Sequence, residues 1–113
     1  MASLEDTNDS VKQLFDTWLS KPNGERYVAH SAAAALRVNP DQAVADLKKY
    51  VPADRLPDVV FHLATEYVMA DIDPRDETPR ARKVIGERAS VLRRYFAAEM
   101  EIGAQRVAAK MRR

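Results

Sequence analysis

The chain has 113 residues and a formal net charge of +1, with 46% hydrophobic and 31% charged residues, a balance typical of globular domains and not of disordered chains. Cysteine is absent, which excludes a disulfide framework, a thiol nucleophile and a cysteine-based zinc site. No apolar run approaches the roughly 18–20 residues of a membrane span, and the first ten residues are polar and acidic. We therefore expect one soluble, cytoplasmic domain over 1–113 that makes no contact with a membrane.

The fold class follows from the spacing of the apolar residues. Spacings of three and four recur from end to end, whereas strict alternation never lasts the length of a strand. Only three glycines are present, and alanine is abundant. The sequence predicts an all-α protein, a compact bundle of about five helices with a long basic helix at its C-terminus.

The first two helices are expected on either side of a Pro-Asn-Gly turn. A polar leader over 1–9 precedes Ser10, which with Gln13 has the form of a reciprocal capping box at the start of the first helix. Pro22-Asn23-Gly24 ends that helix, because proline cannot continue the hydrogen-bond ladder. The second helix runs over 25–38 and carries an alanine-rich face suited to close packing.

The third and fourth helices are expected to begin at capping residues. Asn39 is a strong N-cap, Pro40 suits the first helical position, and Gln42 occupies the reciprocal capping position. Pro52 ends this third helix. Asp54 is expected to cap a fourth helix that ends near residue 70, before an acidic connector over 71–77.

One core is predicted from the apolar stripes of these helices. Its expected members are Leu14, Phe15, Trp18, Leu36, Leu47, Tyr50, Val60, Leu63, Tyr67, Ile85, Leu92 and Phe96.

The last helix is expected to start at Thr78, an N-cap followed by Pro79, and to continue to the C-terminus. A straight helix of this length would span about 52 Å, against a body of roughly 34 Å, so residues 103–113 would overhang. The apolar stripe nevertheless continues into the overhang. This mismatch predicts a homodimer with interface residues Met100, Gly103, Val107 and Met111. The alternative is a frayed, exposed basic tail.

Charge is distributed unevenly between two neighbouring segments. Residues 54–77 contain seven acidic and two basic residues, whereas 78–113 contain ten basic and three acidic ones. Either the acidic connector folds back on the basic helix, or the basic face binds an anionic partner such as nucleic acid. In the second case the phosphate contacts would come from Arg80, Arg82, Lys83, Arg88, Arg93, Arg94, Arg106, Lys110, Arg112 and Arg113.

Residues for catalysis or for a cofactor are sparse. Asp58, His62 and Glu66 share one helix face, which we expect to point to water, with a weak surface metal site as the alternative. His30 and Ser31 are sequence neighbours and point in different directions on a helix. No glycine-rich phosphate loop is present.

We predict no catalytic, metal-binding or cofactor-binding residue. The preferred function is a non-enzymatic adaptor or regulator that binds protein, as a homodimer. Nucleic-acid binding is the alternative, and an enzyme of unknown type is third.

Overall fold

The chain is mainly helical over the region described by the computed structural model, residues 4–112. No strand occurs within this range, which confirms the all-α prediction. The helices are α1 (Leu4–Leu19), α2 (Gly24–Val38), α3 (Pro40–Tyr50), α4 (Leu56–Leu63) and α5 (Pro79–Met111), and a π-helical turn, η1 (Ala64–Val68), continues α4.

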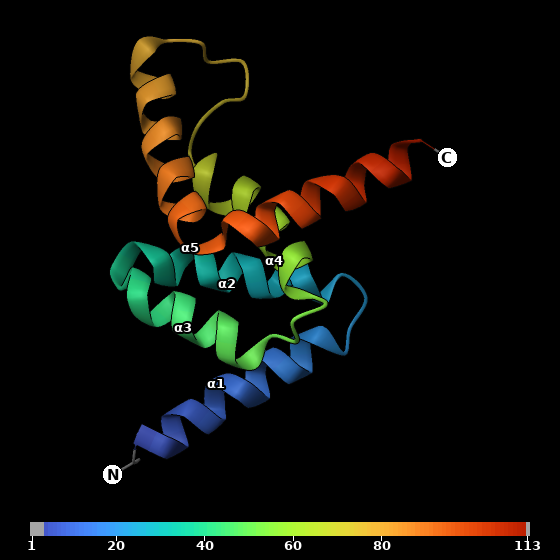
Figure 1. The fold of residues 1–113 in the computed structure, drawn as a ribbon. Coiled ribbons are helices and arrows are strands. Elements are labelled where there is room, and N and C mark those ends of the chain that lie inside the picture. The colour runs from blue at the N-terminus through green and yellow to red at the C-terminus, as the bar shows by residue number, and fades with distance from the viewer. Residues whose placement is uncertain (1–3, 113) are drawn as a thin grey trace.

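Helix α2 lies at the centre of the fold (Figure 1). It packs against α1, α3, α4 and η1, while α5 packs on α4 and η1 from the far side. The face of α2 that makes these contacts is formed mainly by small residues, and its buried members are Gly24, Val28, Ala29, Ala32, Ala33 and Leu36. Small side chains allow neighbouring helices to approach closely, so four elements can share one central helix.

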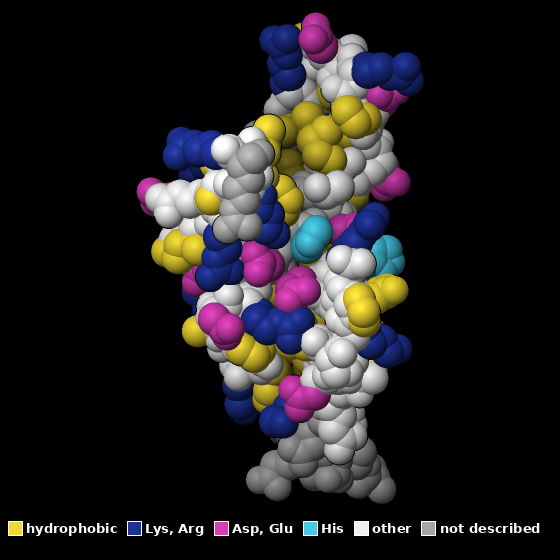
Figure 2. Space-filling view, turned by 90° about the vertical axis from the view of Figure 1, so that its right-hand side faces the viewer, with side chains coloured by type: hydrophobic (Ala, Val, Ile, Leu, Met, Phe, Trp, Pro, Cys, Tyr) yellow, Lys and Arg dark blue, Asp and Glu magenta, His cyan; other side chains and the backbone are white. Residues whose placement is uncertain are grey.

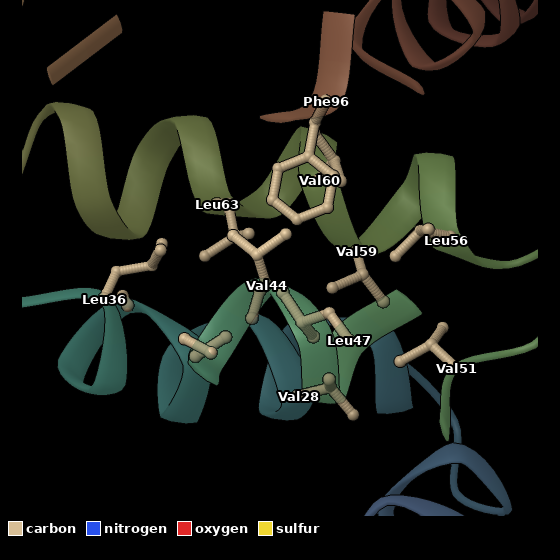
Figure 3. Packing of buried hydrophobic residues seen from close by; sticks show 14 of the residues in the cluster. Val28, Leu36, Val44, Leu47, Val51, Leu56, Val59, Val60, Leu63 and Phe96 are labelled. Carbon is tan, nitrogen blue, oxygen red and sulfur yellow. The ribbon is translucent and has the colours of Figure 1, made fainter. Parts of the chain in front are cut away.

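The core joins α2 and α3 to α4 and α5. Figure 3 shows Phe96 of α5 pointing toward α4, close to Val60, with Leu63, Val44 and Leu47 grouped nearby. Seven predicted core residues are buried: Phe15, Leu36, Leu47, Val60, Leu63, Leu92 and Phe96. Four others are partly buried against them: Trp18, Tyr50, Tyr67 and Ile85.

Leu14 was predicted to be a core residue, and this is wrong. Its side chain is 46% exposed, at the edge of an apolar groove of about 150 Å³ between α1, α2 and α3. Phe15, the next residue, is buried as predicted. The stripe on α1 is wider than the face that α2 and α3 cover, so one of its members remains at the surface.

The cap at Asn39 is confirmed in part. The side chain of Asn39 accepts a hydrogen bond from the backbone N–H of Gln42 at 3.2 Å. The reciprocal bond does not form, because the N–H of Asn39 donates to the carbonyl of Ala35 at the end of α2. The side chain of Gln42 donates instead to Asp46 at 2.8 Å. Asn39 thus ends one helix and begins the next.

Two predicted helix starts are wrong. Helix α1 begins at Leu4, so Ser10 lies inside it and is not its N-cap. At α4 the N-cap position is Arg55, without a side-chain cap. The N–H groups of Arg55 and Leu56 both donate to the carbonyl of Pro52, which leaves no need for a cap from Asp54.

Helix α5 is not straight, and the predicted rod of 52 Å is therefore wrong. Its start is as expected, since the Thr78 hydroxyl accepts the N–H of Ala81 at 3.2 Å. At Phe96, however, the backbone leaves the helical region (φ −135°, ψ 31°). We call residues 79–95 the first arm and residues 97–111 the second arm. Figure 1 shows the two arms pointing in clearly different directions from the bend.

The burial of Leu63 gives a direct test of the core. Leu63 is 0% exposed and Leu14 is 46% exposed. We expect Leu63→Ala to reduce the free energy of unfolding by about 2–5 kcal/mol, the range for core truncations, and Leu14→Ala to reduce it by less than about 1.5 kcal/mol. Urea unfolding of both variants measures this, and similar losses for the two would contradict the position of α4.

The cap of α5 gives a second test. Because the hydroxyl of Thr78 binds a backbone N–H, Thr78→Ala should reduce the free energy of unfolding by roughly 0.5–2 kcal/mol, and Thr78→Gly by only a few tenths. Thermal unfolding monitored by circular dichroism would measure both variants. Equal effects of the two substitutions would argue against a capping role.

Candidate functional site

The second arm of α5 lies against α4 of the same chain. Gly103 is buried at the contact, where a Cβ atom would lie 3.0 Å from the carbonyl oxygen of Pro57 and 3.4 Å from the Cβ of Phe61. Three residues later, Arg106 donates to the carbonyl of Asp54 at 2.9 Å and to the carboxylate of Asp58 at 3.3 Å. The arm is therefore held at the beginning of α4 by a close backbone approach and by a guanidinium group.

The residues predicted to form a dimer interface mostly contact their own chain. Met100 is partly buried against the core, and Gly103 is buried under α4. Val107 is half-buried and Met111 is 81% exposed. The bend at Phe96 accounts for this difference, because it directs the stripe onto α4 instead of past the edge of the body. The dimer itself remains a prediction.

A polar pocket of about 380 Å³ lies beside this contact, between the start of α2, α4 and the second arm. It is lined by Asn23, Glu25, Asp58, Phe61, His62, Arg106, Val107 and Lys110. Figure 2 shows the two histidine side chains on one face of the molecule, among acidic and basic side chains. The two carboxylates of the pocket are both in ion pairs, Glu25 with Arg55 and Asp58 with Arg106.

Arg55 connects three elements of the fold. Its Nε donates to Glu25 at 2.7 Å, and its Nη1 donates to the carbonyl of Leu19 at 2.8 Å. Partial burial raises the pKa of Glu25, but a backbone hydrogen bond and the Arg55 guanidinium outweigh it and hold that pKa below its ordinary value of 4.5. The sequence offered no signal for this pair, because its members are 30 positions apart.

The face formed by Asp58, His62 and Glu66 does not simply point to water as predicted. All three side chains are half-buried. The second arm pairs with Asp58 through Arg106, and Glu66 lies 3.0 Å from His30 Nδ1 on α2. The π-helical turn changes the direction of residues after Leu63, which an ideal α-helical projection could not anticipate. Among the side chains described, those of residues 10–112, no three histidine or acidic residues gather as a metal site.

The basic residues of α5 do not form one continuous surface, because the bend separates them into two groups. On the first arm Arg80, Arg82, Lys83, Arg93 and Arg94 are exposed. Arg88 is half-buried, and its guanidinium donates to the carbonyls of Val68 and Ala70 at 3.2 and 2.7 Å, where it caps the end of η1.

On the second arm Arg106 is bound to α4, whereas Lys110 and Arg112 are exposed. Arg113 lies outside the described residues. Two residues with clear binding potential in the sequence, Arg88 and Arg106, therefore have structural roles.

The acidic connector lies near the first arm without pairing with it. Asp73 binds Arg75 within the connector, and Asp76 accepts the backbone N–H of Thr78. No ion pair in the described part of the chain joins the connector acids to the cations of α5. Asp71, Asp76 and Arg80 do line one open cavity of about 360 Å³, so opposite charges are neighbours at this end of the molecule.

Comparison with protein-family models, with characterised proteins and with solved structures finds no match to this chain. None of the helices in residues 4–112 is long and apolar enough to cross a membrane.

The pair of Glu25 and Arg55 predicts how stability depends on pH. Because the folded-state pKa of Glu25 is lowered, its contribution is fully present above the unfolded-state pKa and is lost as pH falls through the folded-state pKa. Glu25→Gln should therefore destabilise the protein near neutral pH, by roughly 0.5–1.5 kcal/mol, and weaken the loss of stability on acidification.

Urea unfolding at a series of pH values from neutral to acidic would measure this effect. Glu87→Gln, which removes the same charge from an exposed site on α5, is the matched control. Parallel pH profiles for the native chain and Glu25→Gln would contradict the role of Glu25.

Proposed function

We propose that the protein is a non-enzymatic, cytoplasmic adaptor or regulator that acts by protein–protein contact and forms a homodimer. The observation that carries the proposal is the apolar surface around the second arm of α5. Phe61 of α4, which contacts Gly103, is 42% exposed. On the second arm itself, Ile102 is 40% exposed and Met111 is 81% exposed. Large apolar side chains left exposed on this arm and beside it favour a protein-binding role.

The non-enzymatic part of the proposal rests on the polar pocket. A general acid or base must exchange a proton with a substrate, so it needs a carboxylate or imidazole that is not committed elsewhere. Both carboxylates of this pocket are held by arginine side chains, and its one imidazole, that of His62, has no hydroxyl or thiol side chain among the lining residues to activate. Pairs of this kind favour a structural role, since they link α2 and α5 to the start of α4.

Nucleic-acid binding remains a second candidate, favoured by the outer face of the first arm. Arg82, Gly86, Ser90 and Arg93 follow one another at spacings of four, four and three, and Lys83 adjoins them; all are exposed. A Cβ atom on Gly86 would meet nothing within 4 Å, so the middle of this face is open. The neighbouring connector acids weaken the attraction for phosphate, which is why we rank this function second.

The mass of the intact chain in solution tests the proposal. We expect light scattering at tens of micromolar to give the mass of a dimer at both low and moderate salt, because apolar burial is insensitive to screening. A chain that ends at Ile102 should be monomeric. A chain that ends at Met111 is the matched control: it loses the last two arginines, keeps the stripe and should remain dimeric.

A monomeric intact chain would overturn the homodimer. If it also bound a DNA duplex with an affinity that falls steeply between low and moderate salt, nucleic-acid binding would take the first place.

A further inference from the structure

The bend in α5 occurs where nothing in the local sequence ends a helix. Sharp helix kinks usually have a cause in the chain itself, such as proline or glycine. The segment here is Tyr95-Phe96-Ala97-Ala98, which contains neither, and alanine is the strongest helix former. The local sequence therefore favours a continuous helix, and the bend depends on contacts made elsewhere.

The bent conformation of α5 is held by contacts that join each of its two arms to other helices of the fold. On the first arm the Tyr95 hydroxyl donates to Asp41 of α3 at 2.9 Å. On the second arm Gly103 packs under the Pro57 carbonyl, and Arg106 binds Asp54 and Asp58. None of the second-arm contacts requires that the arm and α4 belong to one chain.

The stripe that the sequence analysis assigned to a dimer is thus already used within the chain. Two copies cannot meet face to face through Gly103, because it is buried under α4. Two copies can use the Gly103 contact only if the second arm of each copy leaves its own α4 and packs on α4 of the other copy. An exchange of this kind repeats the closed contacts between chains and is a low-cost route to a dimer.

We propose that the partner of this site is a second copy of the chain, which exchanges its second arm. In the dimer α5 continues through Phe96 as one helix, and residues 97–111 pack on α4 of the other copy. Phe96 keeps its place in the core, since it lies on the same stripe as Leu92 of the first arm. The proposal rests on the homodimer proposed above and specifies how that dimer is built.

The length of α5 fits this arrangement. Its 33 residues would span about 50 Å when straight, of which the second arm provides about 22 Å. The closed molecule measures 48 × 36 × 22 Å. A straight α5 would therefore carry the second arm past the edge of its own body, within reach of another.

Cysteine cross-linking between two different chains tests the exchange directly, since the natural chain has no cysteine. One chain carries Phe61→Cys and the other carries Gly103→Cys. The two Cβ positions are 3.4 Å apart, close to the range of about 3.5–4.5 Å that a disulfide spans. After the chains are mixed, unfolded, refolded together and oxidised, a swapped dimer should give a covalent heterodimer on a non-reducing gel.

A second pair guards against poor folding of Gly103→Cys, whose new side chain must fit beside the Pro57 carbonyl. Asp58→Cys and Arg106→Cys replace two side chains whose tips meet at 3.3 Å; because the arginine side chain is long, a bifunctional thiol reagent such as a bismaleimide replaces oxidation for this pair. The matched control mixes Thr65→Cys, an exposed position on η1, with Arg106→Cys and should give no more than background cross-linking.

The outcomes separate the two proposals. Covalent heterodimers from both test pairs support the exchange. A further variant carries Phe61→Cys and Gly103→Cys in the same chain. If the intact chain is dimeric by light scattering, but this double variant cross-links only within one chain, the exchange is overturned while the homodimer survives. If the intact chain is monomeric and the double variant cross-links only internally, both are overturned.

Discussion

The fold depends on the close approach that small residues allow around α2. Alanines at positions 29, 32 and 33 are buried, and their lack of side-chain bulk lets α1, α3, α4 and η1 share one central helix. The larger side chains of the core then come from the neighbours, with Leu47 of α3, Leu63 of α4 and Phe96 of α5 fully buried. A bulky substitution on this face of α2 would force several helices apart at once, because interiors are packed to high density.

Local signals in the sequence predicted the fold where the chemistry is local. Asn39 and Thr78 cap helices as expected, because an N-cap acts on backbone groups only three residues away. Features that depend on other elements could not be found in this way. The start of α4 uses the carbonyl of Pro52 in place of Asp54, and on either side of the bend at Phe96 the two arms of α5 contact α3 and α4.

The candidate site was predicted in part for the same reason. Periodicity correctly placed Met100, Gly103 and Val107 on one face of α5, since that requires only a regular helix within the second arm. It could not say which surface covers that face. The charge count similarly identified Arg88 and Arg106 as available cations, whereas the structure uses both on backbone carbonyls. Their hydrogen bonds join residues 18 and 52 positions apart in the sequence, and the spacing of residues within one helix cannot predict contacts at such separations.

The position of Arg55 has a consequence for the order in which the protein folds during synthesis. The turn between α1 and α2 is secured by a guanidinium that follows α3, and the buried face of α2 is completed by Val59, Val60 and Leu63. A nascent chain in which only residues 1–50 have been synthesised therefore lacks both Arg55, which secures the turn, and α4, which covers the buried face of α2. Val28 and Leu36 would stay open to water, and to other apolar surfaces, until α4 leaves the ribosome. The first three helices thus leave part of their apolar surface uncovered until α4 has been synthesised, and α5 then completes the core with Leu92 and Phe96.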